Sequence, residues 1–72
     1  MDKVDTRLGE IIKARRKEMK LTQAELADKV GTTAQCIYYY EKGTRGLPMS
    51  LFFKLCSILN LDPNKIQEEV TR

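Results

Sequence analysis

Apolar residues along this chain recur with the spacing of an α-helix in five separate stretches. Helices are predicted over residues 5–19, 23–30, 33–41, 48–59 and 63–70, the first beginning at Asp5 or Thr6. The positions expected to face a common core are Leu8, Ile11, Ile12, Met19, Leu26, Ala27, Val30, Ile37, Tyr40, Met49, Phe52, Leu55, Cys56 and Leu59. Ile66 and Val70 give the last helix only a narrow apolar face. These patterns predict an all-α, compact five-helix domain.

The second and third predicted helices carry clear start and stop signals. Thr22 is a good N-cap, and Glu25 three residues later completes a capping box. Gly31 can adopt the positive φ that ends a helix at low cost. Thr32 or Thr33 then serves as the cap of the next helix. We therefore expect two short helices joined by a tight turn over residues 22–43.

Within this segment a small residue, Ala27, permits two helices to cross closely, and Ile37 supplies a branched apolar contact after the glycine turn. That order is typical of a helix-turn-helix motif. The segment resembles the helix-turn-helix of the lambdoid phage repressor and Cro family, which includes the XRE-like transcriptional regulators. The family's spacing is matched without a gap by Gln23, Leu26, Ala27, Gly31, Ile37, Glu41 and Gly43. The resemblance extends over residues 8–66 and implies one lambda-repressor-like domain, residues 1–72.

In that family the third helix enters the major groove and the second crosses the phosphate backbone. The resemblance and the helical geometry together predict base contacts from Thr33, Ala34, Gln35, Tyr38 and Tyr39. The resemblance further implies phosphate contacts from Gln23, Lys42, Thr44 and Arg45. It also implies a structural ion pair between Arg16 and Glu41, which ties the first helix to the end of the third.

Four positions depart from the family pattern. Arg15 stands where leucine is usual, Lys20 where relatives often have glycine, and Leu47 where a basic residue is found. Tyr39 is bulkier than the usual glutamine or arginine at a base-contacting position. The core stripe of the first helix, the turn after it and the contacts of the loop near Leu47 are therefore expected to differ from the family.

Composition excludes several other classes of protein. The 72 residues include no histidine, no paired metal-ligand spacing and no glycine-rich phosphate loop, so we expect no enzyme, no cofactor and no metal site. Cys36 and Cys56 lie in predicted helices and are expected to be free thiols in a reducing cytoplasm. No apolar run approaches a membrane span, and we expect no signal peptide because no apolar core follows Met1-Asp2-Lys3.

The net charge of +3 does not by itself indicate a binding partner, but the charged residues are unevenly distributed along the chain. Basic side chains crowd the end of the first predicted helix: Lys13, Arg15, Arg16, Lys17 and Lys20. Glu68 and Glu69 place acidic charge near the C-terminus. This asymmetry suits one face against phosphates, although a solvated charged helix gives the same count.

The sequence thus predicts a bacterial or phage-derived, nucleoid-associated repressor that binds double-stranded DNA at a palindromic operator as a homodimer. The dimer surface is expected near the loop before the fourth helix and on the fifth helix, with Leu47, Ile66 and Val70 exposed. An alternative is the antitoxin of a toxin–antitoxin pair, whose first partner is a toxin protein. A third possibility is a helical interaction domain without DNA binding, which is disfavoured by Gln23, Gln35, Lys42 and Arg45.

Overall fold

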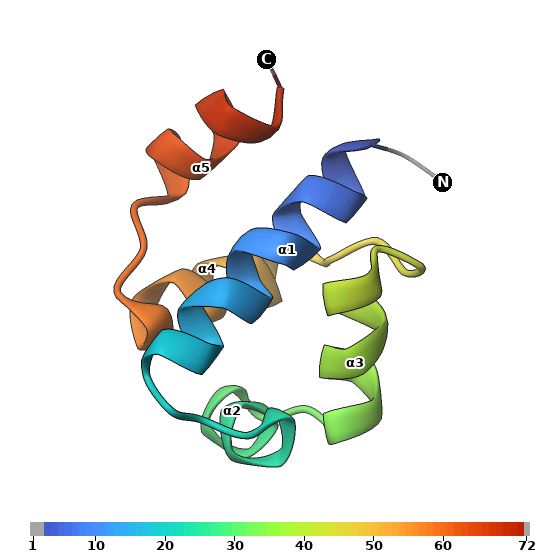
Figure 1. Cartoon of the computed structure of the whole chain (residues 1–72), viewed down its shortest axis with the longest axis vertical. Coiled ribbons are helices and arrows are strands. Elements are labelled where there is room, and N and C mark those ends of the chain that lie inside the picture. The colour runs from blue at the N-terminus through green and yellow to red at the C-terminus, as the bar shows by residue number, and fades with distance from the viewer. Residues whose placement is uncertain (1–2, 72) are drawn as a thin grey trace.

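The computed structural model describes residues 3–71 and shows the expected all-α architecture (Figure 1). The five helices of the described chain are α1 (Lys3–Glu18), α2 (Gln23–Val30), α3 (Ala34–Lys42), α4 (Met49–Leu59) and α5 (Pro63–Val70). Helix α1 crosses the middle of the molecule and contacts α3, α4 and α5, while α2 packs against α3 and α4. The prediction of a compact five-helix domain is confirmed.

The predicted capping signals set the limits of α2 and α3. The Thr22 hydroxyl accepts from the Glu25 backbone N–H at 3.0 Å, and the Thr22 N–H donates to the Glu25 carboxylate at 2.9 Å. Gly31 ends α2 with a φ of 79°. Thr33, not Thr32, caps α3 by accepting from the Cys36 N–H at 3.2 Å. The α2–turn–α3 unit therefore has the form that the sequence predicts.

Three helices begin at other residues than predicted, and α3 does so by one residue, at Ala34, because Thr33 is its N-cap. Helix α1 starts at Lys3, so Asp5 lies inside its first turn, where a carboxylate complements the positive end of the helix dipole. Helix α4 starts at Met49 because Pro48 is its N-cap, with extended backbone at ψ 144°. The Pro48 carbonyl accepts the first helical hydrogen bond, from the Phe52 N–H at 2.9 Å.

The core lies between α1, α2, α3 and α4 and extends under α5. Its central cluster is Ile12, Leu26, Ala27, Val30, Ile37, Tyr40, Leu55 and Leu59. A second cluster, Phe52, Cys56, Ile66 and Val70, joins α4 to α5. Leu8 and Ile11 are half-buried at the edges of these clusters. The inward stripe of α3 places Tyr40 in the core, as predicted.

Five apolar residues differ from the predicted burial, and one of them, Leu47, is half-buried against both core clusters instead of exposed. Met49 is 59% exposed because it is the first residue of α4, at the rim of the molecule. Met19 is 39% exposed and follows the last residue of α1, although its N–H still donates to the Arg15 carbonyl at 3.1 Å. Ile66 and Val70, expected to be exposed, are buried because α5 folds back against α1 and α4.

Two glycines bring α1 and the end of α3 into direct backbone contact. A Cβ atom on Gly9 would lie 2.4 Å from the carbonyl oxygens of Tyr40 and Glu41. A Cβ atom on Gly43 would lie 2.8 Å from the Thr6 Cα, and Gly43 also has a φ of 74°. Nothing in the local pattern of residues distinguishes Gly9, although this contact fixes how α3 lies on α1.

The departures at Arg15 and Lys20 have structural consequences. The Arg15 Nε–H donates to the Leu59 carbonyl at 2.8 Å, so this side chain satisfies an acceptor at the C-terminal end of α4. Lys20 lies in the α1–α2 connection with a φ of 58°, a conformation that favours glycine. The α1–α2 connection therefore has the left-handed turn that a glycine would adopt easily, although the residue in it is a lysine.

Candidate nucleic-acid interface

The outward side of α3 presents the side chains that the sequence analysis identified for base contacts. Thr33, Gln35 and Tyr38 are exposed, and Ala34 and Tyr39 are half-buried. The opposite side of the same helix carries the buried residues Ile37, Tyr40 and Glu41. Each residue of an α-helix is rotated by about 100° from the one before it, which puts residues 34, 35, 38 and 39 on one side and residues 37, 40 and 41 on the other. All five expected side chains therefore lie outside the core on the same helix or its cap.

These side chains contact one another in a defined arrangement. The Gln35 amide nitrogen Nε2 donates to the Tyr39 hydroxyl oxygen at 3.2 Å. The Tyr39 ring lies 5.3 Å from the Arg45 guanidinium carbon and meets the Tyr38 ring edge-on, with centroids 5.6 Å apart. The Lys42 ammonium lies 5.0 Å from the Tyr38 ring centre. Two cation–π contacts thus fix both tyrosines beside cationic groups.

The positions of Arg45 and Thr44 follow from the glycine that ends α3. Gly43, at φ 74°, turns the chain back along the helix. The Thr44 N–H and hydroxyl both donate to the Tyr39 carbonyl, at 3.1 Å and 3.3 Å. The reversal also places an Arg45 nitrogen 3.6 Å from the Cys36 sulfur. We name the set Thr33, Ala34, Gln35, Tyr38, Tyr39, Lys42, Thr44 and Arg45 the α3 surface.

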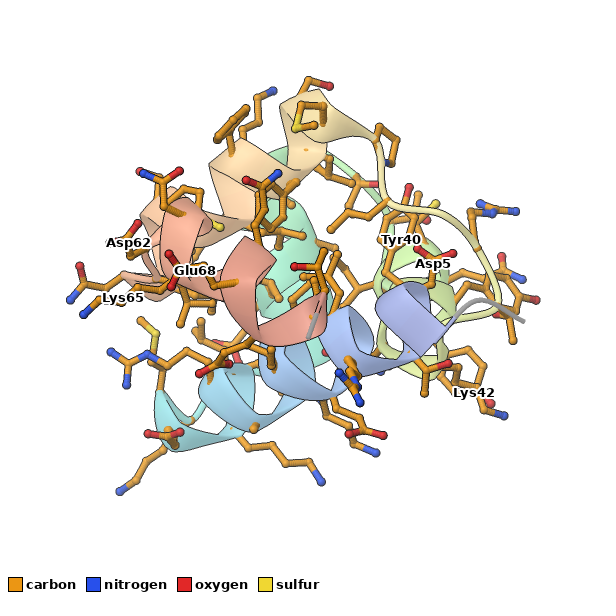
Figure 2. All side chains as sticks on the ribbon, turned by 90° about the horizontal axis from the view of Figure 1, so that it is seen from above. Asp5, Tyr40, Lys42, Asp62, Lys65 and Glu68 are labelled. Atoms are coloured by element: carbon orange, nitrogen blue, oxygen red, sulfur yellow. The ribbon has the colours of Figure 1, made fainter. Side chains whose placement is uncertain are left out.

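The α3 surface is cationic at neutral pH. Lys42 and Arg45 are both exposed on it. The Tyr38 hydroxyl raises the pKa of Lys42 above its ordinary value, which keeps the ammonium charged. Figure 2 shows Lys42 pointing outward on one side of the molecule, while Glu68 of α5 lies on the opposite side. The acidic groups of α5 therefore do not neutralise this surface.

A buried polar network holds α1, α2 and α3 together behind this surface. The Arg16 Nε–H and Nη2–H donate to the two Glu41 carboxylate oxygens at 2.6 Å and 3.1 Å. The Arg16 Nη1–H donates to the Leu21 carbonyl at 2.8 Å. The Gln23 amide donates to the Glu41 Oε1 at 3.0 Å. All buried side-chain nitrogen and oxygen atoms of the described residues have a partner.

Gln23 thus has a structural bond that the sequence analysis missed. The expected phosphate role remains compatible with this bond, because a primary amide nitrogen carries a second hydrogen and Gln23 is only half-buried. No spacing rule would have found the contact. Glu41 is 18 residues away from Gln23, on another helix.

Cys36 is the second side chain whose surroundings the sequence did not reveal. Hydrogen bonds with Thr33 and then Thr32 lower the pKa of its thiol, and the charge of Arg45 acts in the same direction. Cys56 differs, since burial raises the pKa of its thiol. Both cysteines are free. Only tertiary structure could place Arg45 beside Cys36, because the chain reverses between them.

The described residues contain neither a metal site nor a membrane span. No group of three or more acidic or cysteine side chains within residues 3–71 is arranged to hold a metal ion. None of the helices in the described part of the chain has the length and apolar character needed to cross a bilayer.

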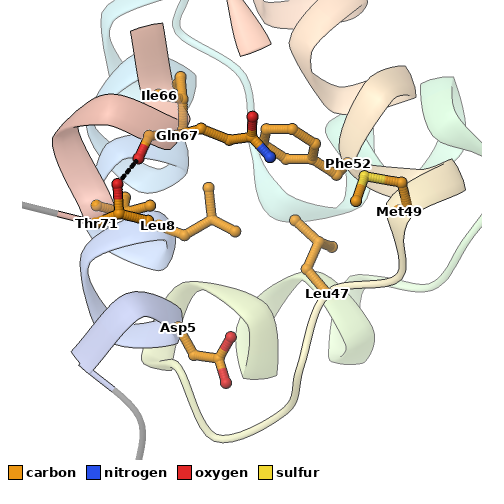
Figure 3. Close-up of a pocket in the computed structure, with 9 residues that line it drawn as sticks. Asp5, Leu8, Leu47, Met49, Phe52, Ile66, Gln67 and Thr71 are labelled. Carbon is orange, nitrogen blue, oxygen red and sulfur yellow. Dashed lines mark hydrogen bonds between the residues drawn. The ribbon is translucent and has the colours of Figure 1, made fainter. Parts of the chain in front are cut away.

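A recess of about 220 Å³ lies between α1, α4 and α5, lined mainly by apolar side chains (Figure 3).

Comparisons with known proteins agree with this architecture. The family model described as "Helix-turn-helix" matches residues 12–66, which include all of α2, α3 and α4. Among solved structures, the crystal structure of the clp gene regulator ClgR from C. glutamicum superimposes with a TM-score of 0.82. The two sequences are 19% identical, and the alignment covers 94% of this chain and 88% of that one. At this identity the structural likeness concerns the fold.

Proposed function

Since the chain belongs to the helix-turn-helix family of Cro/C1-type DNA-binding transcriptional regulators, we propose that it is a repressor of the bacterial cytoplasm that binds a palindromic operator as a homodimer. The single observation that carries this proposal is the α3 surface. It combines hydrogen-bonding side chains with two cations on the outward side of one helix. In the proposed complex α3 lies in the major groove.

Base contacts in the proposed complex come from the outward side of α3. Gln35 presents a carboxamide, which can bond the N6 and N7 atoms of adenine in a bidentate manner. Ala34 is small and apolar, so it suits a thymine methyl group. Thr33, Tyr38 and Tyr39 complete the set that faces the bases.

Phosphate contacts in the proposed complex flank α3 and carry no sequence information. Lys42, Thr44 and Arg45 lie at the end of the helix and just beyond it, and all three are exposed. Gln23 lies at the start of α2, where backbone N–H groups favour an anion. These contacts set the position of α3 relative to the duplex.

Dimerisation is proposed because one small domain buries little surface on DNA. The predicted dimer surface needs correction on α5, since Ile66 and Val70 belong to the core of the same chain. The loop before α4 remains available: Leu47 is half-buried and Met49 exposed, both at the recess in Figure 3. We place the contact between protomers there.

Selection from a library of random duplex DNA, followed by footprinting and sedimentation of the complex, tests this function. The expected result is a repeated half-site, with centres about one helical turn apart, and two protomers for each protected site. An unrepeated half-site bound by one protomer would contradict the dimer. Absence of any selected sequence would contradict the function itself.

One observation favours the alternative of an antitoxin. Phe53 on α4 is 52% exposed, and so is available for an apolar contact with a protein partner. The test is co-expression with the product of an adjacent small gene, followed by sedimentation of the purified pair. A stable complex that Phe53→Ser dissolves, without loss of DNA binding, would support the antitoxin. A chain that sediments alone would oppose it.

A further inference from the structure

We propose that Tyr39 is a positioning residue for Gln35, and that its hydroxyl makes Gln35 prefer adenine over guanine. This inference rests on the proposed function, since it specifies how the α3 surface distinguishes bases. It starts from the hydrogen bond of 3.2 Å between the Gln35 Nε2 and the Tyr39 hydroxyl oxygen.

Tyr39 is the fixed partner in this pair. Tyr39 is half-buried, and its ring meets the Tyr38 ring edge-on with the centroids 5.6 Å apart. Gln35 is exposed, one helical turn before Tyr39. An exposed glutamine ordinarily samples many rotamers, so a bond to a held hydroxyl selects among them. The amide of Gln35 is thereby oriented before DNA arrives.

The same bond changes which base edge Gln35 can complement. A carboxamide has two N–H donors and one carbonyl acceptor. With one N–H bound to Tyr39, the group retains one donor and one acceptor. Adenine requires this pair, since its N7 accepts and its N6 amino group donates. Guanine offers two acceptors, O6 and N7, and would need both N–H groups of Gln35.

The experiment compares Tyr39→Phe with the unaltered protein on duplexes selected from random DNA. The position that Gln35 contacts is the one where Gln35→Ala abolishes base preference. At that position the ratio of adenine to guanine affinity should fall about two- to tenfold in Tyr39→Phe, the range expected for one net hydrogen bond. Non-specific affinity and its salt dependence should stay unchanged, because the substitution removes no charge and retains the ring beside Arg45.

Tyr39→Phe in a Gln35→Ala background is the matched control, because no amide remains there for the hydroxyl to bond, and it should not alter the ratio of adenine to guanine affinity at this position. Three results would overturn this inference while leaving the proposed function intact. They are an unchanged ratio in Tyr39→Phe, a uniform loss of affinity for all bases in that variant, and a preference of the unaltered protein for guanine at this position. Absence of any sequence preference in the unaltered protein would overturn the proposed function together with it.

Discussion

Arg16 and Glu41 lie 25 residues apart and form a bidentate ion pair in the interior, with both residues under 10% exposed. The pair joins α1 to the end of α3, immediately behind the α3 surface. Each charge is satisfied by further groups, the carboxylate by Gln23 and the guanidinium by the Leu21 carbonyl. Removal of one partner would leave the other charged and buried without compensation.

Glu41→Ala should therefore lower the free energy of unfolding by roughly 3–5 kcal/mol. Urea denaturation followed by circular dichroism measures this change. Glu18→Ala is the matched control, because Glu18 pairs with Arg15 at 3.3 Å but its side chain is 65% exposed. Its loss should cost less than about 1 kcal/mol. Equal effects of the two substitutions would contradict the importance assigned to burial.

Gly9→Ala should destabilise the domain by about 1–3 kcal/mol, the usual range for excess volume in a packed interior. The added methyl group would overlap the carbonyl oxygens of Tyr40 and Glu41, and backbone atoms cannot move aside as a flexible side chain can. Gly46→Ala is the control, since a Cβ there meets no atom within 4 Å. Thermal unfolding of both variants tests the difference, and a neutral Gly9→Ala would show that α1 can shift away from α3.

Lys20→Gly should stabilise the protein by about 0.5–1 kcal/mol. A lysine at φ 58° carries the steric cost of the left-handed region, which glycine avoids, although glycine gains entropy in the unfolded chain. Asn60→Gly provides the comparison, since Asn60 has a φ of 57° but asparagine tolerates this conformation better. The midpoint of urea unfolding measures both, and a larger gain at residue 60 would contradict the explanation.

Gln35→Ala and Arg45→Ala should separate base recognition from phosphate binding. The first should relax preference at one base pair and leave non-specific affinity unchanged. The second should weaken binding to all sequences about equally and lower the slope of log affinity against log salt concentration by about one unit, because one fewer counterion is released. Titrations of matched and singly altered operators at several salt concentrations measure both. The assigned roles would be wrong if Arg45→Ala changed base preference while Gln35→Ala weakened binding to all sequences equally.

The two cysteines should differ in their reaction with iodoacetamide. A lowered pKa means that Cys36 reaches its thiolate form at a lower pH than an ordinary cysteine, and the thiolate is the reactive species. The raised pKa of Cys56 and its burial act in the opposite direction. In the folded protein, alkylation of Cys36 should therefore begin at lower pH and proceed faster, as peptide mass spectrometry can show. Equal rates are expected only after denaturation in urea.

Helix limits were predictable wherever the capping chemistry is local. The Thr22–Glu25 capping box and the stop at Gly31 appear in the structure at the expected residues. The signal that begins α5 is also local: Asp62 is the N-cap before Pro63, and its side chain accepts from the Asn64 N–H at 3.0 Å. In each case the signal and the structure involve residues within a few positions of one another.

Burial at the edges of helices was less predictable, because it depends on how helices dock. Helical spacing alone does not show that α5 folds onto α4 and buries Ile66, or that α4 begins at the rim and exposes Met49. Of the candidate site, the outward side of α3 followed from spacing. The approach of Arg45 to Cys36 did not, since it depends on the chain reversal at Gly43.

The two sides of α3 share no residue: Ile37, Tyr40 and Glu41 are buried, and the side chains proposed to contact bases all lie elsewhere on the helix or at its cap. In evolutionary terms this separates two kinds of selection acting on one short helix. Apart from Thr33, which also caps α3, substitutions that alter operator preference fall on positions outside the core, where changes in stability are usually small, whereas the buried positions that hold the helix in place make no contact with the operator. A lineage carrying this domain could therefore acquire new target sites by successive single substitutions, each leading through a folded protein.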